Sequence, residues 1–257
     1  TVQEEDPTTY LEHPLREAVI AAQKSDVVVM CMGIDPSIEG EQGDAYSLFG
    51  DSGDKRSLEF PASQKKLYEA IRSTGKPIIF VNISGSAMAL GDQDEHCAAV
   101  VQQFYPGAQG GNALFDVLFG EVNPSGRLPV TFYRSDSDLP DFSDYSMENR
   151  TYRYFTGTPL YPFGYGLSYT RFACDTPKVR REDGGYAVTV TVRNAGDRDG
   201  ALVVPLYATV KNAPCRVPIC SLVDFARVEL TAGEERILYF RLEDRDVSYV
   251  DETGAFC

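Results

Sequence analysis

An acidic, glycine-containing stretch is the part of the sequence best suited to chemistry. Residues 35–44 read Asp-Pro-Ser-Ile-Glu-Gly-Glu-Gln-Gly-Asp, so Glu39 and Glu41 stand two residues apart and Asp44 follows them. Crowded carboxylates in a partly buried loop repel each other, which raises the pKa of one and leaves an acid able to protonate a departing oxygen. The alternative is that these side chains are solvated charges or cation ligands, since perturbed carboxylates need a partner and a cleft.

The elements around this stretch predict how it is positioned. An apolar run at residues 27–32 comes directly before it, and a second apolar run follows at residues 77–83. Apolar side chains recur at helical spacing before each run, over residues 15–22 and 61–73. Continuous apolar strands that alternate with helices predict a parallel sheet buried on both faces. Ligand sites in such sheets lie at the carboxyl ends of the strands, where residues 35–44 begin.

A third unit of the same kind follows, but its loop has two readings. Residues 98–104 lead through Pro-Gly-Ala-Gln-Gly-Gly at 106–111 into a predicted helix at 112–119, which Gly120 would cap. The exposed N–H groups of that helix could hold an anion. A tight turn that lets the helix pack closely is the favoured alternative, because the glycine spacing matches no nucleotide-binding loop. Ser84-Gly85-Ser86 likewise lacks the nucleophile-elbow pattern of serine hydrolases.

The second half of the chain changes character. Residues 123–172 are rich in Pro, Gly, Asp and Tyr and predict a wrapping loop segment. Its aromatic clusters at 150–155 and 161–169 could stack on sugar rings, although packing between domains is the favoured alternative. From residue 186 apolar and polar residues alternate, and strand-like runs at 186–193, 202–210, 222–230 and 237–242 predict a β-sandwich. We therefore expect an α/β domain at 14–172 and an all-β domain at 173–257.

Composition narrows the possible partners. The 24 basic and 38 acidic residues give a net charge of −14, which argues against binding nucleic acid or an anionic membrane. The sequence has no apolar run long enough to span a membrane, and its spacing of cysteines and two histidines predicts no metal and no cofactor. Cys31 lies inside the first apolar run and is expected to be a buried thiol. The compartment is not determined; we favour a cytoplasmic location over secretion.

Taken together, the motifs resemble the C-terminal region of glycoside hydrolase family 3. The resemblance covers roughly residue 14 to the end, and it rests on the order and spacing of several short motifs. They are Glu39-Gly40-Glu41, residues 58–61, Gly75-Lys76-Pro77, residues 104–107 with Gly110-Gly111, the Asn-Pro-Ser-Gly-Arg-Leu-Pro-Val-Thr run at 123–131, residues 150–155 and residues 161–168. The last part, including residues 246–251, resembles the fibronectin type III-like module of β-glucosidases and β-xylosidases.

The resemblance implies a mechanism and a set of site residues. Family members hydrolyse terminal β-linked sugars with retention, using a nucleophilic Asp on an N-terminal (β/α)8 barrel and, in many, a general-acid Glu on the α/β domain; the two carboxyl groups stand about 5–5.5 Å apart. Glu41 matches the position of that acid best and Glu39 second. Asp44, Asp54 and Arg56 are the expected substrate-binding residues. One departure is that an insertion separates Glu41 from Asp54-Lys55-Arg56, which are usually close behind the acid.

The expected function is therefore that of a partial enzyme. The chain would contribute the general acid/base to a barrel domain in the parent protein or in a partner chain, and would act on an oligosaccharide or on an aryl or alkyl β-glycoside. Because a barrel needs about 200 or more residues, we expect the chain alone to be inactive. The alternative is a carbohydrate-binding or scaffold module that has kept the fold without catalysis.

Overall fold

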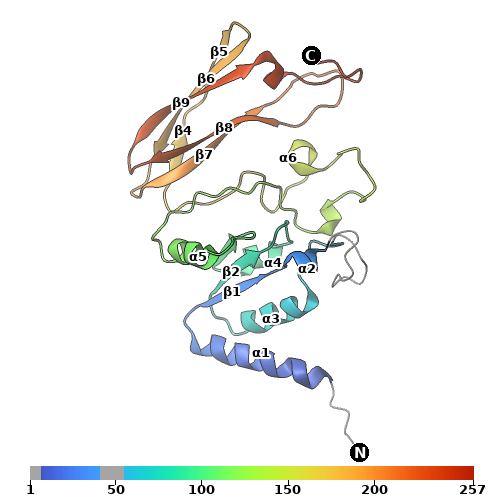
Figure 1. Ribbon diagram of the computed structural model, residues 1–257, viewed down its shortest axis with the longest axis vertical. Helices are drawn as coiled ribbons and strands as arrows, with labels where there is room; N and C mark the ends of the chain where they lie inside the picture. Colours follow the sequence, from blue (N-terminus) through green and yellow to red (C-terminus); the bar gives the residue numbers. More distant parts are fainter. Residues whose placement is uncertain (1–6, 41–54) are drawn as a thin grey trace, which may run out of the picture. The chain divides into compact units, whose positions relative to one another are not determined.

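The computed structural model describes residues 7–40 and 55–257, and for residues 7–14 it describes the backbone alone. The chain divides into two compact units, coloured along the sequence in Figure 1. Residues up to 111 and 132–138 form the first unit, and residues 112–131 and 139–257 form the second. Residues 112–131 thus group with the C-terminal half. The domain boundary that the sequence pattern places after residue 172 stays a prediction.

The first unit is built on a three-stranded parallel sheet. Its strands are β1 (Val28–Gly33), β2 (Ile78–Ile83) and β3 (Ala99–Gln102), with β2 in the centre. Both strand pairs are parallel, which confirms the predicted sheet. The register pairs Gly33 with Ile83 and Asn82 with Gln102. The carboxyl ends of all three strands therefore lie side by side, and the segments that follow them meet at one edge of the sheet.

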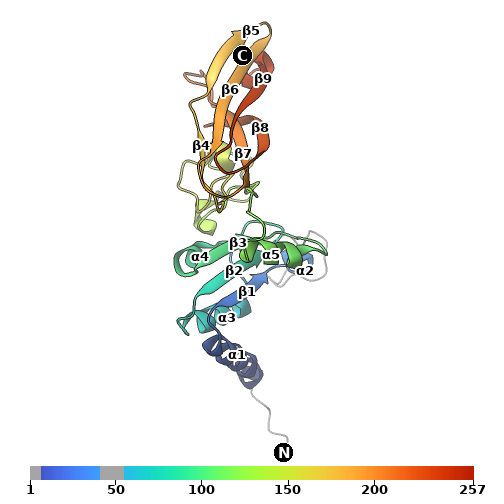
Figure 2. The ribbon, with the colours of Figure 1, turned by 90° about the vertical axis from the view of Figure 1, so that its left-hand side faces the viewer.

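Helices cover this sheet. Figures 1 and 2 both place α1 (Pro7–Lys24) and α3 (Ala62–Arg72) on one side of it, and α1 packs on α3. From α3, Tyr68 lies nearly perpendicular to Phe80 of β2, with 5.8 Å between ring centroids. Two short helices, α2 (Pro36–Glu39) and α4 (Gly91–His96), were not expected from the sequence, because segments this short carry too few residues to show helical periodicity. The predicted helix at 112–119 is α5 (Gly110–Leu118).

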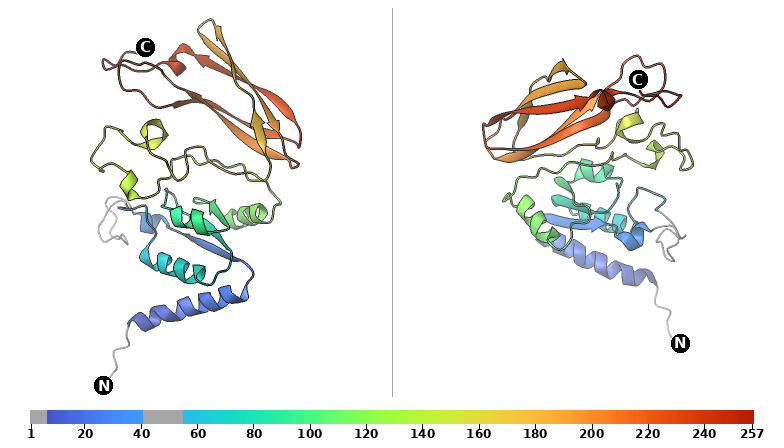
Figure 3. Two further views of the ribbon diagram at one scale, coloured as in Figure 1. Left: turned by 180° about the vertical axis from the view of Figure 1, so that it is seen from behind. Right: turned by 45° about the horizontal axis from the view of Figure 1, so that its top comes forward.

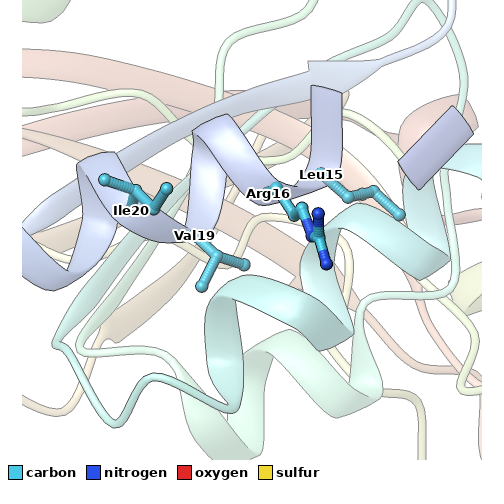
Figure 4. A pocket seen from close by; sticks show the side chains of 4 residues that line it. All are labelled: Leu15, Arg16, Val19 and Ile20. Carbon is cyan, nitrogen blue, oxygen red and sulfur yellow. The ribbon is translucent and has the colours of Figure 1, made fainter. Parts of the chain in front are cut away.

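Helix α1 carries several apolar side chains. Leu15, Val19 and Ile20 line a shallow hollow there together with Arg16 (Figure 4). Ile20 is 50% exposed, as is usual for single apolar residues on a protein surface. Among residues 7–40 and 55–257, no helix is both long and apolar enough to cross a bilayer.

Strand β1 is less buried than its sequence suggested, and the prediction of a buried Cys31 is wrong. The side chain of Cys31 is exposed, and Val29 on the same face is 46% exposed. Successive side chains of a strand point to opposite faces, and here Met30 and Met32 take the covered face. In contrast, the central strand β2 is buried on both faces, with Phe80 and Val81 at 1% and 0% exposure. Of the two continuous apolar runs, only the one that forms the central strand β2 is buried on both faces.

The second unit contains the predicted β-sandwich. One antiparallel sheet comprises β4 (Phe172–Cys174), β5 (Lys178–Glu182), β6 (Gly185–Asn194) and β9 (Glu235–Glu243), and the other pairs β7 (Gly200–Ala208) with β8 (Ser221–Leu230) (Figure 3). Alternate residues of both sheets form one core: Val188, Val190, Val192, Val228, Leu230, Phe240 and Leu242. Strands β4 and β5 were missed because their side chains are mostly exposed and show no apolar alternation. The described residues also form the 3₁₀ helices η1 (Asp136–Asp138) and η2 (Asp244–Val247) and the short α6 (Thr151–Tyr154).

Asn194, at the end of β6, holds several turns of the sandwich together. Its side chain is fully buried; Nδ2 donates to the carbonyl oxygens of Arg198 (2.7 Å) and Leu230 (3.2 Å), and Oδ1 accepts from the Thr170 hydroxyl (2.7 Å). We expect Asn194→Ala to lower the free energy of unfolding by about 3 kcal/mol, because it leaves buried partners unsatisfied. Urea denaturation measures this loss. The neighbouring exposed Arg193→Ala should change stability by less than about 0.5 kcal/mol, and equal losses would contradict the role assigned to Asn194.

Candidate active site

The candidate site begins where β1 ends, at Gly33. This residue has φ +144°, and a Cβ added to it would lie 1.8 Å from the carbonyl oxygen of Ile83 on the neighbouring strand. Gln64 of α3 binds both backbone groups of Gly33: its Nε2 donates to the carbonyl oxygen (2.5 Å) and its Oε1 accepts from the N–H (3.1 Å). The chain therefore leaves the sheet at a closely defined point, which only glycine can occupy.

Helix α2 then places Glu39 at this edge. Asp35 is its N-cap and accepts from the N–H groups of Ser37 (2.8 Å) and Ile38 (3.2 Å), and Pro36 opens the helix. The Ser37 hydroxyl is the main reason that the pKa of Asp35 lies below its ordinary value, with the backbone N–H groups adding to it. Gly40, at φ +67°, ends the helix directly after Glu39. The side chain of Glu39 is thus presented from the last position of a short, capped helix.

Two hydroxyl groups from other elements hold the carboxylate of Glu39. Ser86, in the turn after β2, donates to Oε1, and Tyr105, after β3, donates to Oε2. The Tyr105 hydroxyl also lies 3.2 Å from the carbonyl oxygen of Ile34. Since one hydroxyl proton serves one acceptor at a time, the charged carboxylate is the stronger partner. Glu39 follows β1, and the two groups that hold its carboxylate follow β2 and β3, so segments after all three strands meet here at the carboxyl end of the sheet.

Tyr105 remains a hydrogen-bond donor over a wide pH range. Partial burial, and then its bond to the Glu39 carboxylate, raise the pKa of Tyr105 to about 12. Its side chain is nonetheless 45% exposed, so the site faces outward. Gly85 makes the approach of the two residues possible, because a Cβ there would lie 2.5 Å from the Tyr105 ring and 2.8 Å from Oε2 of Glu39.

A buried polar network lies beneath Ser86. Asn82 and Ser84 are both fully buried at the end of β2. Nδ2 of Asn82 donates to Ser84 Oγ (3.0 Å) and to Oε1 of Gln102 on β3 (2.5 Å), and Ser84 Oγ donates to the carbonyl oxygen of Ser86 (2.8 Å). This network sets the turn that carries Ser86. It was missed from the sequence, although Asn82 interrupts an otherwise apolar strand and was a usable signal.

Lys55 brings a cation to the same part of the first unit. Its Nζ donates to the carbonyl oxygen of Ala87 (2.6 Å) and lies 3.3 Å from the sulfur of Met88. Burial lowers the pKa of Lys55, while the carboxylates of Glu39 and Asp136 act in the opposite direction. Lys55 was not among the predicted site residues. Its positive charge and the Glu39 carboxylate attract each other.

The predicted site residues have different outcomes. Glu39 is brought together with Ser86 and Tyr105, and Arg56 is exposed on the surface. Glu41, Asp44 and Asp54 lie outside the described residues. Within the described part of the chain, no group of three or more His, Cys, Asp or Glu side chains could hold a metal ion.

The two other candidate motifs have structural roles in this structure. Gly110 is buried, and a Cβ there would lie 2.4 Å from the Pro106 ring, which supports the tight-turn reading of residues 106–111. In the aromatic segments, Tyr152 stacks on Phe163, with 4.5 Å between ring centroids, and its hydroxyl accepts from the N–H of Leu222 on β8. Tyr161 stacks on Tyr165 in the same way, at 5.0 Å. These contacts support packing rather than sugar stacking for these rings.

Comparison with known proteins decides the family. The model of the glycosyl hydrolase family 3 C-terminal domain matches residues 5–169, which is more than half of the chain. The chain belongs to glycoside hydrolase family 3. The model of the fibronectin type III-like domain matches residues 202–257 of this family 3 chain. Both matches confirm the fold class expected from the sequence.

Relatives of this family 3 chain are longer proteins. It is 41% identical to a xylan 1,4-β-xylosidase of Xylanibacter ruminicola over 238 residues, which is 92% of this chain and 27% of the relative. It is 34% identical to a periplasmic β-glucosidase of Salmonella typhimurium, covering 93% of this chain and 33% of that one. A solved β-glucosidase from Erythrobacter marinus superimposes with a TM-score of 0.80 at 36% identity, covering all of this chain and 35% of that one. The chain thus spans about a third of their length.

Proposed function

We propose that this chain is the C-terminal portion of a retaining β-glycosidase that removes terminal β-linked glucose or xylose, and that Glu39 is its general acid/base. The relatives named as β-xylosidase and β-glucosidase support the reaction and the sugars. The observation that carries the role of Glu39 is the pair of hydroxyl donors that fix its carboxylate at the carboxyl end of the sheet. The sequence favoured Glu41 as the general acid, so the experiments compare variants of Glu39 with variants of Glu41.

The environment of Glu39 suits a group that must change protonation state. In a retaining glycosidase the acid first protonates the leaving oxygen, and the resulting carboxylate then takes a proton from the attacking water. Serine and tyrosine hydroxyls can both donate and accept hydrogen bonds. When Glu39 is a carboxylate, Ser86 and Tyr105 can therefore both donate to it. When Glu39 is protonated, one of the two hydroxyls can instead accept a hydrogen bond from the carboxyl group. The geometry of Glu39 would then stay the same through both steps.

The nucleophile belongs, in this proposal, to a (β/α)8 barrel in the parent protein or a partner chain. The purified chain should therefore not turn over aryl β-glucosides or aryl β-xylosides. A hybrid enzyme, in which this chain replaces the part of the X. ruminicola xylosidase that it matches, should be active. Turnover by the purified chain that Glu39→Gln abolishes would contradict the partial-enzyme proposal. An inactive but folded hybrid would favour the alternative of a non-catalytic carbohydrate-binding or scaffold module.

The two hydroxyl partners of Glu39 should contribute separately to catalysis. In the hybrid enzyme we expect Ser86→Ala and Tyr105→Phe each to lower kcat/KM for an aryl β-xyloside about tenfold, because a hydrogen bond to a charged group contributes roughly 1.5 kcal/mol or more. Steady-state kinetics on purified variants measures this. Tyr239→Phe is the control, since Tyr239 lies in the sandwich and is 76% exposed. Wild-type rates in both test variants would show that these hydroxyls do not position the acid.

A further inference from the structure

The segment between β2 and α4, which carries Ser86, has no regular secondary structure, and its backbone is bonded to another segment of the first unit. The carbonyl oxygen of Ala87 accepts from Lys55 Nζ (2.6 Å). Two residues further on, the N–H of Ala89 donates to the carbonyl oxygen of Leu58 (2.7 Å). The stretch from Lys55 to Leu58 therefore lies beside the turn that carries Ser86 and is bonded to it twice.

The bond from Lys55 is the stronger of these two links, because its donor is a charged ammonium group. Nζ also lies 3.3 Å from the sulfur of Met88, whose side chain is 1% exposed. Replacing the ammonium group by an apolar one would take this donor away from the part-buried carbonyl oxygen of Ala87. Since Ser86 is the residue next to Ala87, its hydroxyl would lose its fixed position as well.

The charge of Lys55 lies close to the acid. Burial lowers the pKa of Lys55, and the carboxylates of Glu39 and Asp136 act against this effect. The bond to the carbonyl oxygen of Ala87 fixes the direction of the ammonium group. Lys55 therefore binds the turn that carries Ser86 while its charge attracts the carboxylate that Ser86 holds.

Asp136, from η1, holds the other end of the stretch that begins at Lys55. One of its carboxylate oxygens accepts from the Ser57 hydroxyl and the other from the N–H of Leu58, both at 2.7 Å. Asp136 lies 78 residues beyond Leu58 in the chain. These two bonds help to explain why residues 132–138 group with the first unit. They also fix the backbone from which the side chain of Lys55 reaches Ala87.

We propose that Lys55 is a positioning residue for the general acid, and that Asp136 in turn positions Lys55. Lys55 acts through the backbone of Ala87 on the neighbouring Ser86. Ser86 then keeps the carboxylate of Glu39 in place. Neither Lys55 nor Asp136 needs to touch the substrate for this role. The inference rests on the proposed function, in which Glu39 is the acid/base.

Kinetics of the hybrid enzyme test this role. Lys55→Met keeps the length of the side chain and removes the ammonium group. It should lower kcat/KM about tenfold for an alkyl β-xyloside, whose leaving oxygen needs a well-placed acid. For a dinitrophenyl β-xyloside, which departs without protonation, kcat/KM should change less than about twofold. Lys66→Met is the matched control: Lys66 is exposed on α3, and this variant should keep both wild-type rates.

A double-mutant cycle shows whether Lys55 acts through Ser86. In the Ser86→Ala background the hydroxyl that Lys55 positions is gone, so Lys55→Met should lower kcat/KM for the alkyl β-xyloside by less than about threefold. A general structural disturbance would instead lower kcat/KM by the same factor in both backgrounds. Equal factors, or equal losses on the alkyl and dinitrophenyl substrates, would overturn the proposal.

If Lys55→Met fails to fold by circular dichroism, Asp136→Ala decides, because its side chain is exposed. It should lower kcat/KM selectively for the alkyl β-xyloside, by about threefold. Asp138→Ala is its control, since that carboxylate accepts from the N–H of Arg134 nearby in the chain. Wild-type kinetics of the deciding variant would overturn this proposal and leave the role of Glu39 intact. A wild-type leaving-group dependence in Glu39→Gln would overturn the proposed function itself, and this inference with it.

Discussion

Replacing Glu39 by Gln should lower kcat/KM of the hybrid enzyme about 10²- to 10⁴-fold on substrates with a poor leaving group, such as an alkyl β-xyloside. Removing a general acid costs this much where the leaving oxygen needs a proton. The loss should be far smaller for a dinitrophenyl β-xyloside in the glycosylation step, because that leaving group departs without protonation. The dependence of kcat/KM on the leaving-group pKa, measured over a series of aryl xylosides, should therefore become steeper in the variant.

Two matched variants make this result specific. Glu41→Gln removes the neighbouring carboxyl group that the sequence favoured, and it should keep a leaving-group dependence close to that of the wild type. Asp35→Ala removes the side-chain cap of α2 and keeps Glu39. Because it disturbs only the position of the acid, it should steepen the leaving-group dependence less than Glu39→Gln does. A steeper dependence in Glu41→Gln together with a normal one in Glu39→Gln would assign the acid to Glu41 instead.

Gly33→Ala should be among the most destabilising substitutions in the first unit, with a loss of about 3–5 kcal/mol. The new Cβ would lie 1.8 Å from the carbonyl oxygen of Ile83, and a non-glycine residue at φ +144° is strained. Relief requires β1 and β2 to separate where their carboxyl ends meet, which would also displace Glu39. Urea denaturation followed by circular dichroism measures the loss of stability.

Gly75→Ala is the control for this steric argument. Gly75 also has a positive φ, at +72°, but nothing lies within 4 Å of a Cβ added there. The substitution should cost about 1 kcal/mol from backbone strain alone. If Gly33→Ala and Gly75→Ala were equally stable, contact with Ile83 would not be what requires glycine at residue 33.

The fold could be predicted from the sequence because its signals are local. The central strand β2 is apolar at nearly every position, and β6 alternates valines with polar residues, so each reports its own environment. In contrast, the residues of a strand do not show whether that strand lies at the edge or in the centre of its sheet. The run at residues 27–32 looked like that of a central strand, yet β1 ends the three-stranded sheet and leaves Val29 and Cys31 exposed.

The candidate site could be predicted only in part for the same reason. Residues 35–44 follow an apolar strand in the sequence. That position was the one signal that predicted Glu39 to lie at the carboxyl end of the sheet, where the structure has it. Its partners Ser86 and Tyr105 lie 47 and 66 residues further along the chain. Only the parallel register of β1, β2 and β3 brings them together, and no spacing rule in the sequence encodes that register. The choice between Glu39 and Glu41 stays a prediction, because Ser86 and Tyr105 bind the carboxylate of Glu39 while Glu41 lies outside the described residues.

Chemical rescue by azide tests the central claim most directly. In the hybrid enzyme, Glu39→Ala should leave a covalent glycosyl-enzyme that water attacks slowly, since no base remains to activate it. Azide needs no such base. With a dinitrophenyl β-xyloside, added azide should therefore restore turnover of Glu39→Ala and yield β-xylosyl azide, with retained configuration. Rescue of Glu41→Ala but not of Glu39→Ala would contradict the account.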